Sequence, residues 1–146
     1  MLINKNEVPV VAMDFMNATH FEDVDIINNL FESILAYERN PSASSKKSLV
    51  SQYNLWINHT IEHFASEEKM MMEKRFPAYS FHKTEHDKIL ELMKSYLGNF
   101  TLYSDIQELK KYFIEELPAW LTNHIKSMDT VTAIFLKTGL SPCSMR

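Results

Sequence analysis

The sequence predicts an all-α protein, an up-down-up-down four-helix bundle with an N-terminal arm and a short C-terminal helix. The first observation is that only two of the 146 residues are glycine, far below the usual ~7%, whereas β-hairpins need residues that tolerate a positive φ. The second is a series of long stretches with apolar residues at helical spacing. The third is that short loops separate these stretches, as in antiparallel bundles.

Length and composition narrow the class of protein. A chain of 146 residues predicts a single domain, and its apolar fraction of 45% and charged fraction of 23% exclude disorder. No apolar run approaches the roughly 20 residues of a membrane span. A formal net charge of -4 argues against a nucleic-acid partner. The N-terminus lacks signal-peptide features, and the single cysteine, Cys143, excludes an internal disulfide, so we expect a cytoplasmic protein.

The expected elements follow in order from the N-terminus. We expect an arm over residues 1–17, a bundle over about residues 18–128 and a tail helix over about residues 129–138. The first helix of the bundle would cover about residues 19–38. Its apolar face follows 3.6-residue spacing and consists of Val24, Ile27, Phe31 and Ile34.

The second and third helices are bounded by turn-forming residues. Ser44 or Ser45 is the expected N-terminal cap of the second helix, which would end near Lys74. The third would run from about Ser80 to residue 97, because Gly98 suits a left-handed C-terminal cap.

A fourth helix is expected from a capping box at residues 104–107 to about residue 127. Pro118 lies inside it and should kink or interrupt it. The tail helix would then end at Gly139.

Histidines occur on all four predicted helices, with apolar residues around them. Because residues four apart share a helix face, His82 and His86 should point inward together, as should His63 and Glu67. Burying such groups ionised and unpaired costs several kcal/mol, and a shared metal centre would remove this penalty. Imidazole and carboxylate ligands without thiolate suit iron, zinc or manganese. Five imidazoles and two carboxylates exceed the needs of one tetrahedral zinc and fit two octahedral ions.

Three sequence blocks resemble the hemerythrin family in its single-domain bacterial form. They are HFASEE at residues 63–68, HKTEH at residues 82–86 and WLTNHIKSMD at residues 120–129, in the order that the family shows. The resemblance covers about residues 16–137. It implies reversible O2 binding at a non-haem di-iron centre inside a four-helix bundle.

The same resemblance implies a ligand set. One iron would be held by His82, His86 and His124, and the other by His20 and His63. Glu67 and Asp129 would bridge the two ions together with an oxo or hydroxo group, and O2 would bind at the iron that has two histidines. The helix must loosen for this, because five residues turn an ideal helix by about 500° and leave His124 and Asp129 about 140° apart.

Other residues near the predicted ligands are less specific. The expected dry wall of the O2 pocket consists of Phe64, Trp120, Leu121 and Ile125. His59, one turn before His63, is either a core histidine satisfied by a carbonyl or carboxylate, or a group that reaches the bound oxygen species or the open metal position. Asn17 and Thr19 stand where the family usually has aspartate and glutamine, which bears on the tuning of the two-histidine iron. Glu68 and Glu85 are expected to be exposed neighbours of ligands.

The leading functional hypothesis is O2 binding for storage, delivery or sensing, without catalysis. An alternative is a di-iron enzyme that activates O2, peroxide or nitric oxide, which His59 would favour. A further alternative is an iron-binding or storage protein. The sequence identifies no protein partner.

Overall fold

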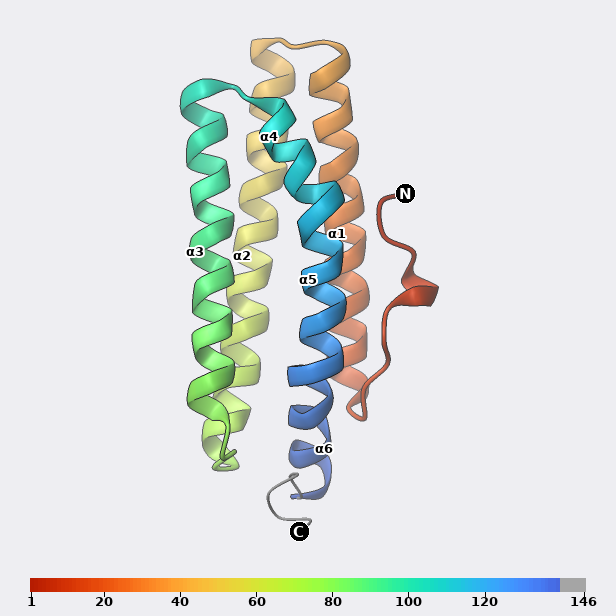
Figure 1. Ribbon diagram of the computed structural model, residues 1–146, viewed down its shortest axis with the longest axis vertical. Coiled ribbons are helices and arrows are strands. Elements are labelled where there is room, and N and C mark those ends of the chain that lie inside the picture. Colours follow the sequence, from red (N-terminus) through yellow and green to blue (C-terminus); the bar gives the residue numbers. More distant parts are fainter. Residues whose placement is uncertain (140–146) are drawn as a thin grey trace.

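The computed structural model describes residues 1–139 and confirms an all-helical bundle (Figure 1). Three long helices, α1 (Asp14–Arg39), α2 (Ala43–Glu73) and α3 (Tyr79–Tyr103), pack with a fourth helical stretch. That stretch consists of α4 (Ile106–Lys111), η2 (Tyr112–Glu116), α5 (Leu117–His124), η3 (Ile125–Asp129) and α6 (Thr130–Thr138). Cys143 lies outside the described residues. None of the helices described is both long and apolar enough to cross a membrane.

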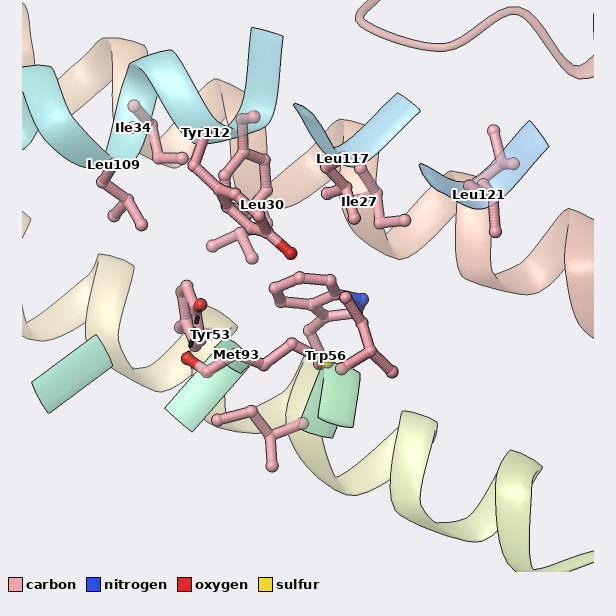
Figure 2. Packing of buried hydrophobic residues seen from close by; sticks show 14 of the residues in the cluster. Ile27, Leu30, Ile34, Tyr53, Trp56, Met93, Leu109, Tyr112, Leu117 and Leu121 are labelled. Carbon is pink, nitrogen blue, oxygen red and sulfur yellow. Dashed lines mark hydrogen bonds between the residues drawn. The ribbon is translucent and has the colours of Figure 1, made fainter. Parts of the chain in front are cut away.

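Aromatic and aliphatic side chains from all four helical stretches pack into a core (Figure 2). This core lies toward the end of the bundle at which α1 connects to α2, the upper end in Figure 1. Tyr53, Trp56 and Phe113 form a group of tilted and edge-to-face rings with centroids 5.2–6.3 Å apart. The buried Tyr53 hydroxyl donates a hydrogen bond of 2.7 Å to the Met93 carbonyl, which satisfies its polar atom. This core ends just above the histidines and holds the helices that carry them.

The first two helices begin earlier than predicted. α1 starts at Asp14 instead of about Thr19, because the fully buried Met16 belongs to its inward face. α2 is capped by Ser42, not by Ser44 or Ser45. The Ser42 hydroxyl accepts from the Ser45 backbone N–H at 3.0 Å, and the Ser45 hydroxyl contacts the Ser42 N–H in return.

The predicted end of the third helix at Gly98 is wrong. α3 continues to Tyr103 and brings Phe100 into the core against Tyr37. Burying a phenylalanine gains roughly 1.5–3 kcal/mol, more than the ~1 kcal/mol that glycine costs inside a helix. The left-handed cap is Ser104, with φ 55°.

The predicted capping box of the fourth stretch is also wrong. Asp105 is the cap of α4, and its carboxylate accepts from the Glu108 N–H at 3.2 Å. Downstream, Pro118 is preceded by the π-helical segment η2, in which the Leu117 N–H bonds to the Tyr112 carbonyl five residues back. The helix therefore adjusts before the proline without breaking, and it ends as predicted, at Gly139 with φ 75°.

The N-terminal arm runs along the bundle and includes the short 3-10 turn η1 (Lys5–Glu7). Two asparagines of α1 hold it in place. The Asn28 amide exchanges two hydrogen bonds with the Ile3 backbone, of 2.8 and 2.9 Å, and the Asn17 amide does the same with the Val11 backbone. The arm thus covers part of the bundle without contributing a histidine.

Candidate metal centre

Two groups of buried side chains with metal-ligating atoms lie inside the lower half of the bundle. The first consists of His82, His86, His124 and Asp129, and the second of His20, His63 and Glu67. Within each group, one ligand atom per residue lies within 4.8 Å of all the others. We call them the three-histidine cluster and the two-histidine cluster. All seven predicted ligands fall in one or the other.

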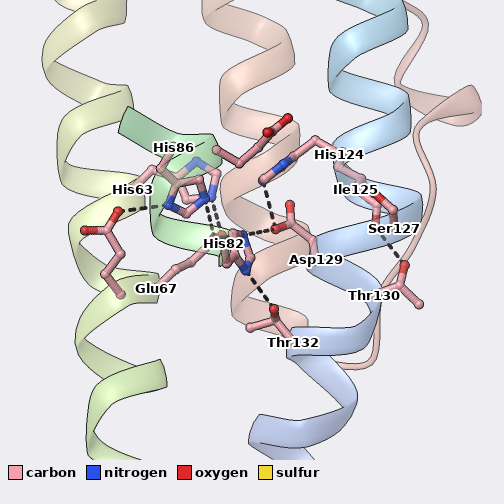
Figure 3. A network of polar contacts seen from close by, with 12 residues as sticks. His63, Glu67, His82, His86, His124, Ile125, Ser127, Asp129, Thr130 and Thr132 are labelled. Carbon is pink, nitrogen blue, oxygen red and sulfur yellow. Dashed lines mark hydrogen bonds and ion pairs between the residues drawn. The ribbon is translucent and has the colours of Figure 1, made fainter. Parts of the chain in front are cut away.

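The two carboxylates lie between the clusters, with one oxygen toward each. Asp129 Oδ2 is 3.0 Å from His20 Nε2, whereas Oδ1 is 3.1 Å from His82 Nε2 and 3.2 Å from His124 Nε2. Several of these contacts are visible in Figure 3.

Glu67 is arranged in the same way. Its Oε2 is 2.6 Å from His63 Nε2, and its Oε1 is 3.5 Å from His86 Nε2 and 3.8 Å from His82 Nε2. Each carboxylate therefore offers one oxygen to each cluster, which is the arrangement that a bridging ligand requires.

Many of these atoms have no hydrogen-bond partner among the described residues, although they are buried. They include the Nε2 atoms of four histidines and one oxygen of each bridging carboxylate: His20, His82, His86, His124, Glu67 and Asp129. Leaving buried polar groups unsatisfied costs about 1–3 kcal/mol each. Cations between the imidazoles and carboxylates would satisfy them together, so the donor set fits metal binding.

The charges of the cluster also favour a cation. Burial alone would raise the pKa of Asp129, but His124, His20 and His82 hold it well below its usual value. Burial and the neighbouring His82 and His124 lower the pKa of His86 to about 2, so this imidazole stays neutral. An ionised carboxylate, as at Asp129, and a neutral imidazole, as at His86, are the forms that ligate metals.

The segment η3 brings Asp129 to the centre. In this π-helical turn the Thr130 N–H bonds to the Ile125 carbonyl, five residues earlier. Because π-helical bonding joins residues i and i+5, side chains five apart lie about one turn from each other. His124 and Asp129 therefore face the same side, through the local loosening that the spacing required. The helix continues through this turn into α6, where two helices were expected.

Two ring nitrogens that face away from the three-histidine cluster, those of His82 and His86, contact neighbouring side chains. His82 Nδ1 lies 2.8 Å from Thr132 Oγ1, and His86 Nδ1 lies 2.9 Å from Glu68 Oε2. Such contacts fix the tautomer and the ring orientation of a ligand. Glu68 was expected to be an exposed neighbour, and this is wrong, because its side chain is 16% exposed and reaches His86. Glu85 is half-buried as well and accepts from Trp120 Nε1 at 3.3 Å.

On the other side, Asp23 contacts two imidazoles of α2. Its Oδ2 lies 2.9 Å from His63 Nδ1, and its Oδ1 lies 2.8 Å from His59 Nε2. Burial would raise the pKa of Asp23, but the two histidines lower it. The contact with Asp23 in turn raises the pKa of His59. Of the two alternatives for His59, the structure therefore supports a histidine whose ring is satisfied by a carboxylate, that of Asp23.

Asp23 was missed at the sequence level. It follows His20 by three residues and so shares its helix face, which is a signal that the sequence contains. Asn17 and Thr19, the two departures from the family pattern, bond to backbone groups. Asn17 binds the arm, and the Thr19 hydroxyl donates to the Phe15 carbonyl at 2.9 Å.

Two aromatic rings stack on ligand imidazoles. The Phe64 ring lies 3.7 Å from that of His86 with an interplanar angle of 2°, and the Trp120 ring lies 4.7 Å from that of His124 at 11°. These stacked rings restrict rotation of the imidazoles and cover them with apolar surface.

A cavity of about 30 Å³ borders the two-histidine cluster. One water-sized molecule needs roughly 10–15 Å³, so the cavity has room for a diatomic gas. Phe64, Trp120 and Leu121 line it as expected, whereas Ile125 does not and is buried beside the arm. Lining residues that the sequence did not indicate are Ile27, Trp56, Thr60, Ile89, Met93 and Leu117.

Comparison with known proteins agrees with this geometry. The family model described as Hemerythrin HHE cation binding domain matches residues 11–133. The chain belongs to the hemerythrin family. Bacteriohemerythrin of Aquifex aeolicus is 28% identical over 133 residues, which are 91% of this chain and 96% of that protein.

Further hemerythrins are similar over shorter stretches. Bacteriohemerythrin of Ralstonia nicotianae is 31% identical over 93 residues, 64% of this chain and 66% of that protein. Myohemerythrin of Sipunculus nudus is 24% identical over 100 residues, 68% and 71% of the two chains. No solved structure gives a significant match. For a hemerythrin-family chain, the buried histidine and carboxylate clusters are the expected non-haem metal site.

Proposed function

We propose that this chain binds O2 reversibly at a non-haem di-iron centre, for oxygen storage, delivery or sensing. The observation that carries the proposal is the cavity of about 30 Å³ beside the two-histidine cluster. It touches both histidines of that cluster, whereas of the three-histidine cluster it touches only His124 and Asp129. A cluster with fewer ligands leaves room for an exogenous one, and the cavity lies at this cluster. The bacteriohemerythrin and myohemerythrin relatives support the same proposal.

Each cluster would hold one iron. His82, His86 and His124 would hold the first ion, and His20 and His63 the second. Glu67 and Asp129, each with one oxygen toward each cluster, would bridge the pair together with an oxo or hydroxo group. When bound, two ferrous ions would supply the electrons needed to hold O2 reversibly.

The residues of the cavity wall keep water and protons away from this position. Apart from the ligand clusters and Asp23, the lining residues with polar hydrogens are Thr60, Trp120 and Trp56. The Thr60 hydroxyl donates to the Trp56 carbonyl at 2.8 Å, and the Trp120 indole donates to Glu85. The donors of Thr60 and Trp120 therefore point to partners of their own. A mostly apolar wall, with these two donors turned to other partners, favours binding and release over a reaction that consumes protons.

The enzyme alternative depended on His59. That side chain contacts Asp23 and does not line the cavity. This position of His59 gives no support to O2, peroxide or nitric oxide activation, so we propose a carrier or sensor.

Anaerobic loading with ferrous iron tests the proposal. We expect metal analysis to find two irons per chain, and exposure to air to produce a visible charge-transfer band that bleaches when O2 is removed under argon. A band that persists under argon, or steady consumption of O2 by the loaded protein, would instead indicate an enzyme.

A further inference from the structure

We propose that His59 is a positioning residue for the two-histidine iron, which it serves by holding Asp23 against the ligand His63. The proposal rests on the metal centre of the proposed function, but not on reversible O2 binding. The three residues form a chain in which one carboxylate joins two imidazoles of α2 that lie one turn apart.

Each oxygen of Asp23 serves one imidazole. Oδ2 lies 2.9 Å from His63 Nδ1, and Oδ1 lies 2.8 Å from His59 Nε2. Asp23 comes from α1 and is 6% exposed, whereas the His59 side chain is 22% exposed. The chain therefore runs from the rim of the bundle to its interior and crosses from α2 to α1 and back.

This arrangement determines which nitrogen of His63 is available to a metal. A carboxylate at Nδ1 favours the tautomer that has its proton there and its lone pair on Nε2. His63 Nε2 is the atom that faces Glu67 and the cluster. A neighbouring carboxylate also increases the basicity of a ligand imidazole, and replacing such a partner usually costs 10–100-fold in metal affinity.

Asp23 would be poorly held without His59. The carboxylate is nearly buried, and the contact described for its Oδ1 within residues 1–139 is the one with His59 Nε2, at 2.8 Å. A buried oxygen without a partner is costly, so a carboxylate that lost His59 would turn toward water. His63 would then lose the contact that orients its ring.

The two-histidine cluster has no second support of this kind in the described part of the chain. His20, its other imidazole, has an Nδ1 atom without a hydrogen-bond partner. In the three-histidine cluster, by contrast, Thr132 contacts His82 and Glu68 contacts His86, whereas His124 Nδ1 has no hydrogen-bond partner among the described residues. Loss of His59 should therefore weaken the two-histidine site and leave the three-histidine site unchanged.

Titration with Co²⁺ in the absence of O2 measures the two sites separately, because its visible spectrum reports coordination at each step. We expect two binding events for the wild type. In His59→Phe and in the smaller His59→Ala, one event should weaken by about 10–100-fold while the other stays unchanged. In His59→Gln it should be restored, since the glutamine amide can donate to Asp23 from a similar position. The exposed Asn58→Ala is the matched control.

A second readout does not require bound metal. In the metal-free protein, the His63 Nδ1–H should give a slowly exchanging NMR signal in the wild type and in His59→Gln, and a fast-exchanging one in His59→Ala. Unchanged Co²⁺ binding in His59→Ala, equal weakening of both events, or no rescue by His59→Gln would overturn the proposal. None of these outcomes depends on whether O2 is released, so the proposed function is tested independently.

Discussion

Buried carboxylates dominate the chemistry of this centre at the level of single residues. In Glu67, Asp129 and Asp23, each of the two carboxylate oxygens contacts a different imidazole. None of the three residues is more than 6% exposed. Desolvation alone would protonate such groups. The histidines keep Asp23 and Asp129 ionised, because they lower the pKa of both carboxyl groups. Cation binding therefore has its anionic ligands ready before a metal arrives.

Adjacent glutamates provide a matched test of this arrangement. Glu67 faces both clusters, whereas Glu68 contacts only the outer nitrogen of His86. We expect Glu67→Gln to reduce the iron content from two ions per chain to one or none, because an amide supplies one oxygen where a bridge needs two. Glu68→Gln should retain both ions with affinity at one site reduced by about 10-fold or more. Metal analysis after anaerobic loading distinguishes the two, and equal iron content in both variants would contradict the bridging role.

The sequence predicted the seven residues that gather in the two clusters, but not what surrounds them. Three motifs and helical spacing indicated six of them, and His20 was chosen as the histidine of the first helix. Asp23 and Glu68 act across helices, on His63 and on His86 respectively. Which carboxylate meets which imidazole depends on how the helices pack, and spacing along the chain does not contain that information.

At the level of elements, the irregular turns of the fourth stretch place its functional residues. The segment η2 precedes Pro118, and η3 joins His124 to Asp129. The five-residue spacing predicted a local loosening, but a helix end was expected where a π-helical turn occurs. The sequence could not distinguish the two, because both relieve the same angular mismatch. The error at Gly98 has a similar origin, since the burial of Phe100 outweighed a local preference.

Changes of register test the role of η3. Deleting the exposed Ser127 shortens the step from His124 to its carboxylate from five residues to four, which is about one α-helical turn, so both side chains should still share a face. We expect this variant to retain two irons. Inserting one alanine after Ser127 makes the step six residues, which rotates the carboxylate away on either kind of helix, and iron at both sites should be lost.

Circular dichroism should show similar helix content in both register variants. If the deletion lost iron as completely as the insertion, a geometric account of the π-helical turn would be contradicted.

On the scale of the whole molecule, an apolar core packed between the helices (Figure 2) adjoins a polar centre (Figure 3). The core holds the helices that carry the histidines and carboxylates of the two clusters. The sequence predicted the bundle from its glycine count and helical periodicity. It did not predict the cavity, because a volume of about 30 Å³ depends on the packing of residues from every helix.

A centre with unsatisfied buried groups should make the metal-free protein less stable than the loaded one. Binding to the folded state at 100-fold above Kd adds about 2.7 kcal/mol, and each kcal/mol raises Tm by about 2–4 °C for a chain of this size. We therefore expect iron or Co²⁺ to raise Tm by at least about 5 °C, and chelation to reverse the change. The same experiment on a His86→Ala variant should give a smaller shift, and an equal shift would mean that the metal binds elsewhere.

Oxygen stoichiometry over repeated cycles tests reversible binding most directly. Protein loaded anaerobically with ferrous iron is exposed to O2, evacuated and exposed again, while the gas taken up and released is measured against the iron content. We predict one O2 taken up per two irons and an equal amount released in each cycle. Uptake without release, or uptake that continues beyond one O2 per two irons, would contradict a carrier and show that the centre consumes O2.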